Sequence, residues 1–127
     1  MKKTIIDLFE TSVEQYGAKT FLLEKRHRKF EPTTYAETKE QALEVGAGLA
    51  STGIRPGDKV AILAEGSNAW IISELGLFYA GAVSVPLSVK LEESNDLLFR
   101  MRHAEVKAVF VSKHQLPKIR RIRAGLP

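Results

Sequence analysis

Two clusters of basic residues are the parts of this sequence best suited to bind a ligand. The first runs from Lys25 to Lys29 and the second from Lys113 to Arg123. Clustered lysines and arginines can neutralise phosphates, so each cluster could hold a nucleotide or a nucleic acid. No aromatic residues alternate with the basic ones, as a platform for single strands requires, so we expect no nucleic-acid binding. The alternative interpretation is a solvated turn for the first cluster and a solvated helix face, carrying Gln115, Lys118 and Arg121, for the second.

Other reactive residues give little indication of a catalytic or metal site. The chain has no cysteine, which excludes disulfides and thiolate chemistry. His27, His103 and His114 are too far apart in sequence to suggest a ligand set, so we expect no metal site. Glu65 follows an expected strand and is predicted to face solvent. We therefore predict no catalytic residue in this chain.

The composition is typical of a folded domain. The 127 residues suit one domain, and 44% of them are hydrophobic against 27% charged. No apolar run approaches the ~20 residues that span a bilayer. Asp7 and Glu10 interrupt the apolar pattern near the start, so no signal peptide is expected and the predicted location is the cytoplasm. The net charge of +4 comes mainly from the two basic clusters.

The first fifty residues predict two helices with a hairpin between them. The first helix follows a capping box formed by Thr4 and Asp7, and Gly17 is expected to end it in a left-handed conformation. The hairpin is predicted to turn over Lys25–Lys29. A second helix begins at another capping box, Thr34-x-x-Glu37, and ends near Gly53.

Short apolar runs alternate with helices from Gly53 onward, which is typical of a parallel sheet covered on both faces. The expected strands are 60–63, 82–85 and 108–111, and the expected helices are 69–79 and one around Leu97–Met101. The helix 69–79 is apolar nearly all round and should be buried, with Trp70 used for packing. The predicted fold class is α/β: a partial doubly wound parallel sheet with flanking helices, preceded by an N-terminal helix plus a β-hairpin.

Other nucleotide-binding folds share this layout but lack support in the sequence. The loop 63–67 has one glycine where a dinucleotide-binding loop has three, and no Gly-x-x-x-x-Gly-Lys-Ser/Thr loop is present. A phospho-accepting domain would need paired carboxylates at a strand end to hold magnesium, and strands 60–63 and 108–111 end without them.

Five segments of the chain follow one another in a distinctive order. The segment Gly53–Leu63, reading GIRPGDKVAIL, leads into the first expected strand of the sheet. It is followed by a helix with Trp70 and by Gly81–Leu87, reading GAVSVPL, with Thr34–Glu37 upstream and Lys107–Ser112 downstream. In order and spacing these segments resemble the AMP-forming acyl-CoA synthetases, members of the adenylate-forming enzyme superfamily, whose helix start reads Thr-Tyr-x-Glu. The resemblance covers nearly the whole chain.

The resemblance implies a function for a longer protein. Family members use ATP and magnesium to convert a carboxylic acid, here expected to be a fatty acid, to an acyl-adenylate, and then transfer the acyl group to coenzyme A. The Ser/Thr/Gly-rich phosphate loop ending in Pro-Lys-Gly is not found in this sequence. We therefore expect residues 1–127 to be the N-terminal part of a large AMP-binding domain, a truncated piece that is inert alone, needs no cofactor and self-associates. The longer protein could be peripheral to a membrane.

One ligand contact is suggested within this chain. In some relatives the nucleotide end of coenzyme A lies against this general region, so Lys118 and Arg120 are candidate ligands for the coenzyme's phosphates.

Two other interpretations of the whole chain stay open. One is a stand-alone α/β interaction or nucleic-acid-binding module, and the other is a different adenylating branch, such as a peptide-synthetase adenylation domain or a luciferase-like enzyme.

Overall fold

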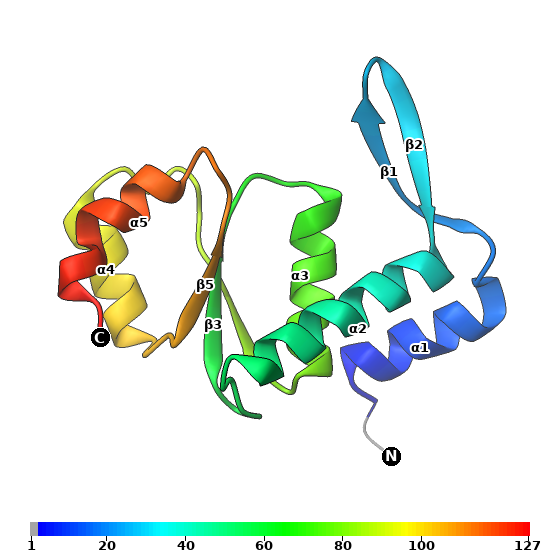
Figure 1. The fold of residues 1–127 in the computed structure, drawn as a ribbon, viewed down its shortest axis with the longest axis horizontal. Coiled ribbons are helices and arrows are strands. Elements are labelled where there is room, and N and C mark those ends of the chain that lie inside the picture. Colours follow the sequence, from blue (N-terminus) through cyan, green and yellow to red (C-terminus); the bar gives the residue numbers. More distant parts are fainter. Residues whose placement is uncertain (1–2) are drawn as a thin grey trace.

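The computed structural model describes residues 3–127 and places a helical part with a projecting hairpin beside a three-stranded parallel sheet (Figure 1). In chain order the elements are α1 (Ile5–Tyr16), β1 (Thr20–Arg26), β2 (Lys29–Thr34), α2 (Tyr35–Ser51), β3 (Lys59–Leu63), α3 (Asn68–Tyr79), β4 (Val83–Pro86), α4 (Ser94–His103), β5 (Ala108–Val111), α5 (Leu116–Ile122) and a 3-10 turn, η1 (Arg123–Gly125).

Both predicted capping boxes are confirmed. The Asp7 amide donates to Thr4 Oγ1 at 3.1 Å and the Thr4 amide donates to Asp7 Oδ2 at 2.9 Å. The same reciprocal bonds join Thr34 and Glu37 at the start of α2. The prediction for Gly17 is wrong, since its φ of −43° and ψ of −43° are right-handed. Its carbonyl accepts from the Ala36 amide at 3.0 Å, so tertiary contact with α2 decides how α1 ends.

The hairpin is tighter than expected. Strands β1 and β2 pair antiparallel from Thr20 opposite Thr34 to Arg26 opposite Lys29, which leaves only His27 and Arg28 in the turn. Both turn residues have positive φ, 47° and 69°, the conformation of a two-residue turn that follows the twist of its strands. The hairpin projects as an arm from the body (Figure 1).

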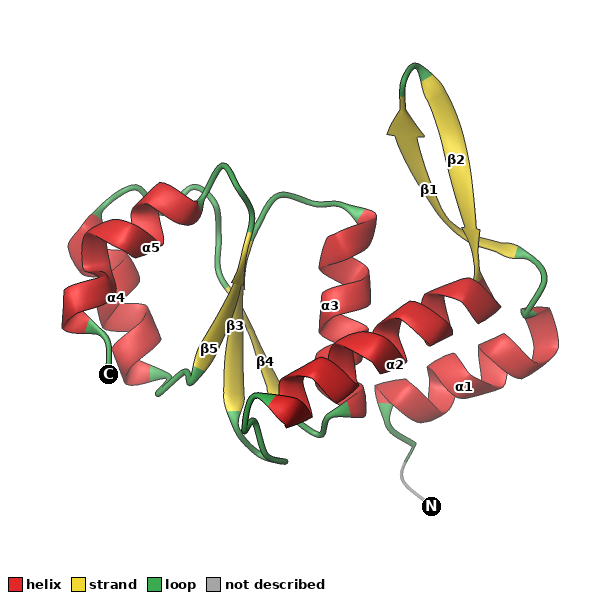
Figure 2. Cartoon of the chain, in the orientation of Figure 1, coloured by secondary structure: helices red, strands yellow, loops and turns green. Residues whose placement is uncertain are grey.

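The sheet has the order β4-β3-β5, with both pairs parallel (Figure 2). Side chains alternate across a strand, so β3 supplies two faces. Val60 and Ile62 pack with Leu49 of α2 and Leu77 of α3, while Leu63 packs on the other face. That second face is covered by four side chains from α4 and α5: Leu97, Met101, Ile119 and Ile122. The predicted α/β sheet with helices on both faces is confirmed.

Two helices approach each other closely because small residues line their contact. A Cβ on Gly76 of α3 would lie 2.5 Å from Val45 Cγ1 of α2, and a Cβ on Gly46 would lie 3.0 Å from the Gly76 carbonyl oxygen. Only glycine therefore fits at position 76 without a shift of α2.

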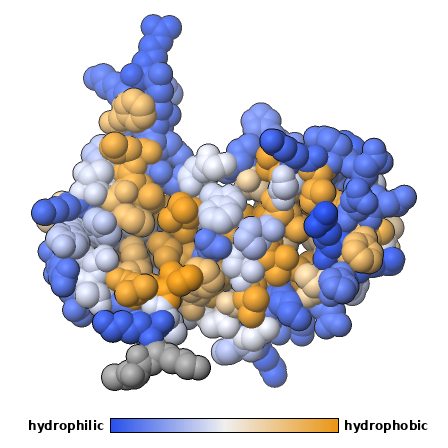
Figure 3. Space-filling view, turned by 180° about the vertical axis from the view of Figure 1, so that it is seen from behind, coloured by the Kyte–Doolittle hydropathy of each residue, from blue (hydrophilic) through white to orange (hydrophobic). Residues whose placement is uncertain are grey.

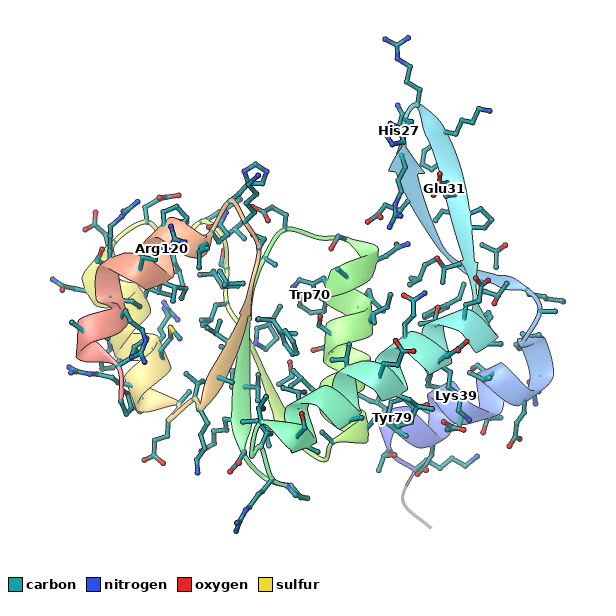
Figure 4. All side chains as sticks on the ribbon, viewed as in Figure 1. His27, Glu31, Lys39, Trp70, Tyr79 and Arg120 are labelled. Carbon is teal, nitrogen blue, oxygen red and sulfur yellow. The ribbon has the colours of Figure 1, made fainter. Side chains whose placement is uncertain are left out.

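Helix α3 is less buried than its composition suggested. Leu75 and Leu77 are buried, but the other large apolar residues of α3 are only half-buried. Trp70 packs against the cluster around Leu77, so its assignment to packing is confirmed (Figure 4).

None of the helices within residues 3–127 combines the length and hydrophobicity needed to cross a bilayer.

A polar contact ties the three N-terminal helices together. The Glu10 carboxylate of α1 receives the Lys39 ammonium of α2 at 2.6 Å and also the Tyr79 hydroxyl of α3. The Lys39 hydrogen bond is the main cause that lowers the pKa of Glu10, and the Tyr79 hydroxyl adds to it. Burial, followed by the Glu10 contact, raises the pKa of Tyr79. The contact therefore favours a charged carboxylate bridged to a neutral phenol.

Candidate functional site at the carboxyl edge of the parallel sheet

The sheet has a switch point between β3 and β5. These strands are neighbours, but α3 after β3 covers one face of the sheet and α5 after β5 covers the other. Loops that leave neighbouring strands toward opposite faces open a crevice at the carboxyl ends, where open α/β sheets generally bind ligands. Here the two loops contribute Glu65 and the segment Ser112–Gln115.

A hydrogen bond spans this crevice. The Gln115 side-chain amide donates to Glu65 Oε1 at 2.8 Å. This bond is the main cause that lowers the pKa of Glu65 to about 2, and the Ser112 hydroxyl contributes next. Glu65 was expected to face solvent; it is half-buried, and its carboxylate is held in the ionised form as an acceptor between two loops.

Two neighbouring polar atoms keep unused hydrogen-bonding capacity. Ser112 Oγ and Gln115 Oε1 are buried, and neither makes a hydrogen bond within the described residues 3–127. The Ser112 hydroxyl is thus near enough to Glu65 to influence its pKa without a bond of good geometry. Buried polar atoms are normally paired, so this edge of the sheet could accept a further polar group.

Lys118 is committed to the protein itself. Its residue is only 9% exposed, and its ammonium donates to the Val89 carbonyl at 2.7 Å and to Glu92 Oε1 at 3.2 Å. The alternative interpretation, in which Lys118 lies on a solvated helix face, is therefore wrong. Its ammonium attaches α5 to the loop between β4 and α4, beside the same crevice.

Arg120 lies elsewhere on the same helix. It is exposed on the outer side of α5 (Figure 4). Residues two positions apart point to different sides of a helix, so the structure does not bring Arg120 and Lys118 onto one face. An exposed guanidinium fits an anionic ligand such as a coenzyme phosphate, whereas the Lys118 ammonium fits the role of holding the loop. Coenzyme A binding by these two residues stays a prediction.

The three histidines lie on separate elements. His27 is in the hairpin turn, His103 ends α4 with its ring stacked on Phe99, and His114 is in the loop after β5. Within residues 3–127, no three potential metal ligands of the histidine, cysteine or acidic type gather in one place.

Comparison with known proteins identifies the family. The sequence model of the AMP-binding enzymes matches residues 9–126. The chain belongs to the AMP-binding enzyme family. The match contains the whole sheet, both loops of the crevice, and all but the first residues of α1.

Related sequences include acyl-activating ligases. A chloroplastic long-chain-fatty-acid–[acyl-carrier-protein] ligase of Arabidopsis thaliana is 29% identical over 109 residues, which is 86% of this chain and 15% of that protein. Long chain acyl-CoA synthetase 5 of the same plant is 30% identical over 118 residues, 89% of this chain and 18% of that protein. The chain thus spans less than a fifth of these relatives.

Solved AMP-binding structures share the fold. An anthranilate CoA ligase in complex with anthranoyl-AMP superposes with a TM-score of 0.87 at 26% identity, covering 96% of this chain and 23% of that one. The N-terminal domain of FACL13 from Mycobacterium tuberculosis gives a TM-score of 0.84 at 25% identity, covering 97% of this chain and 31% of that one.

Sequence reasoning missed Ser112 and Gln115 as partners of Glu65. Ser112 was noted only as the end of an expected strand and Gln115 only as part of a solvated helix face, and Gln115 lies 50 residues from Glu65 in sequence. The available signal was topological: if β5 is placed next to β3, as in the order β4-β3-β5, the loops after these two strands meet at one edge of the sheet.

Proposed function

We propose that residues 1–127 form the N-terminal part of the large AMP-binding domain of an enzyme that activates a carboxylic acid. In this proposal the longer protein uses ATP and magnesium to form an acyl-adenylate and then transfers the acyl group to coenzyme A. The observation that carries the proposal is the family match over residues 9–126 together with the shared fold. The names of the long-chain relatives favour a fatty acid as the substrate.

The contribution of this segment is structural. The reacting groups of the proposed enzyme lie outside residues 1–127, and no step of ATP chemistry is assigned to the residues described above. The parallel sheet and its loops hold the carboxyl edge in place through Glu65–Gln115 and Lys118. The proposed location is the cytoplasm.

Coenzyme A binding is the finer part of the proposal. Arg120 would contact a phosphate of the coenzyme directly, because it is an exposed cation beyond the carboxyl end of β5. Lys118 would act by positioning the loop that contains Val89 and Glu92. In an active enzyme that carries this segment, Arg120→Ala should raise the coenzyme requirement and leave adenylation unchanged. Arg121→Ala, also exposed on α5, is the matched control.

A segment exchange tests the proposed function. Residues 9–126 would replace the equivalent segment of the anthranilate CoA ligase, and anthranilate-dependent exchange of pyrophosphate into ATP would be measured. We expect the exchange to be retained at a reduced level, since the same fold would carry the same downstream parts. The recipient enzyme without its N-terminal segment should be inactive. A chimera that unfolds cooperatively but shows no exchange would contradict the proposal.

A further inference from the structure

The β1–β2 hairpin has two faces of different chemistry. The register places Lys25 opposite Phe30 and Leu23 opposite Pro32. Directly paired residues, and residues two positions apart on a strand, share one face of a hairpin. These four residues therefore form one surface, here called the hairpin face. Its two largest apolar side chains are strongly exposed, Leu23 at 60% and Phe30 at 67%.

The opposite face carries the ion pairs of the arm, and its Glu24 contacts the body. Arg26 pairs with Glu24 at 2.9 Å and approaches Glu31 at 3.9 Å. Glu24 also accepts from the Asn68 amide at the start of α3, at 3.2 Å. The Arg26 contact, followed by the Asn68 amide, lowers the pKa of Glu24. The contact of Glu24 with the start of α3 therefore orients the hairpin, while the hairpin face with Leu23 and Phe30 remains exposed to solvent.

The end of the arm adds positive charge next to the apolar side chains. Lys25, Arg28 and Lys29 are exposed, and none of the three forms an ion pair within residues 3–127. His27 lies at the tip and Glu31 on β2 (Figure 4). In the space-filling view the tip is hydrophilic, while hydrophobic side chains cover the lower part of the arm and continue over the body beneath it (Figure 3).

We propose that the hairpin face, with Arg28 and Lys29, binds the surface of an anionic lipid bilayer. Exposed apolar side chains flanked by lysine and arginine suit an interface where acyl chains lie beneath anionic headgroups. Charge complementarity decides for this partner, because Lys25 lies on the hairpin face, Arg28 and Lys29 lie at the adjoining tip, and none of the three is ion-paired within residues 3–127. A nucleic acid is less suitable, since a single aromatic residue does not make a stacking platform. The proposal does not depend on the proposed enzymatic function.

Vesicle flotation tests this binding. The full chain would be mixed with vesicles of phosphatidylcholine alone, or of equal parts phosphatidylcholine and phosphatidylserine. We expect flotation only with the anionic vesicles, and weaker binding at high salt. Each cation near such a surface contributes about fivefold in affinity, the equivalent of ~1 kcal/mol. Changing Lys25, Arg28 and Lys29 to Gln together should therefore abolish flotation. Changing the equally exposed Lys113, Arg121 and Arg123 to Gln is the control of equal charge.

A second measurement separates insertion from charge attraction. Tryptophan introduced as Phe30→Trp should be quenched by brominated lipids, with the wild-type chain, which contains only Trp70, as the background. Phe30→Ser should weaken flotation although the net charge is unchanged. The proposal is overturned if the chain does not bind anionic vesicles, if the two triple variants lose binding equally, if Phe30→Trp is not quenched, or if only RNA, DNA or an acidic protein is bound.

Discussion

Gln115 donates its side-chain amide to Glu65 Oε1 across 2.8 Å, and this bond joins the loops that follow β3 and β5. Glu65 and Gln115 lie on loops that leave the sheet toward opposite faces, so the bond between them holds the carboxyl edge of the sheet together. Because it lowers the pKa of Glu65 to about 2, it also makes the stability of this edge depend on pH.

The folded chain should therefore lose stability in acid through Glu65. A carboxyl group whose pKa is lower in the folded than in the unfolded state stabilises the fold above its unfolded pKa of about 4.3. That contribution falls as the pH drops from there through about 2. Denaturant midpoints measured across this range should fall less steeply for Glu65→Gln than for the wild type. Glu40→Gln, at an exposed site on α2, is the control. Parallel curves for Glu65→Gln and the wild type would contradict the assignment.

Replacing the glycine at the α2–α3 contact should destabilise the chain. Gly76→Ala would place a Cβ 2.5 Å from Val45 Cγ1, and such overpacking costs about 1–3 kcal/mol. Gly48→Ala is the matched control: it is helical, and its Cβ would meet no atom within 4 Å. That substitution should stabilise the chain by about 0.4–1 kcal/mol. Chemical denaturation measures both, and equal effects would show that the helices are not in close contact.

Loss of the Lys118 ammonium should also be costly. Lys118→Met keeps the aliphatic stem but removes the hydrogen bond from the buried ammonium to the half-buried Val89, and a hydrogen bond to a charged group contributes about 1.5–3 kcal/mol. Arg121→Met, on the exposed side of α5, should change stability by no more than about 0.5 kcal/mol. Hydrogen exchange should also become faster in the loop around Val89. If both variants unfold at the wild-type denaturant concentration, Lys118 has no anchoring role.

Self-association remains a prediction that the fold makes more specific. Strand β4 is at an edge of the sheet, and Val83 on it is 45% exposed. Exposed edges favour pairing with another chain, and a lysine on the edge prevents it. We expect a dimer in analytical ultracentrifugation that Val83→Lys dissociates, while Leu43→Lys on α2 does not. A monomer at high concentration that unfolds cooperatively would refute the prediction.

Local signals in the sequence predicted much of the fold. The capping residues Thr4 and Thr34 mark real helix starts. Gly53, which was expected to end the second helix, has a positive φ of 96°. Each of these features depends on residues a few positions apart, which is why the sequence pattern was sufficient.

Features that depend on distant residues were not predictable in this way. The conformation of Gly17 depends on contact with Ala36, and the burial of Lys118 depends on the loop around Val89. The sequence pattern suggested that Lys118 lies on a solvated face of α5. It could not show that the loop between β4 and α4, which contains Val89, covers that side of the helix. The Glu65–Gln115 contact required the strand order β4-β3-β5, which periodicity does not specify.

The most direct measurement is acid-dependent pyrophosphate release by purified residues 1–127, assayed beside the anthranilate ligase chimera that carries residues 9–126. The account assigns the scaffold to this chain and the reacting groups to the rest of the proposed enzyme. It therefore predicts release by the chimera and none by the isolated chain with any carboxylic acid. Release of pyrophosphate from ATP by the isolated chain, dependent on an added acid, would contradict it.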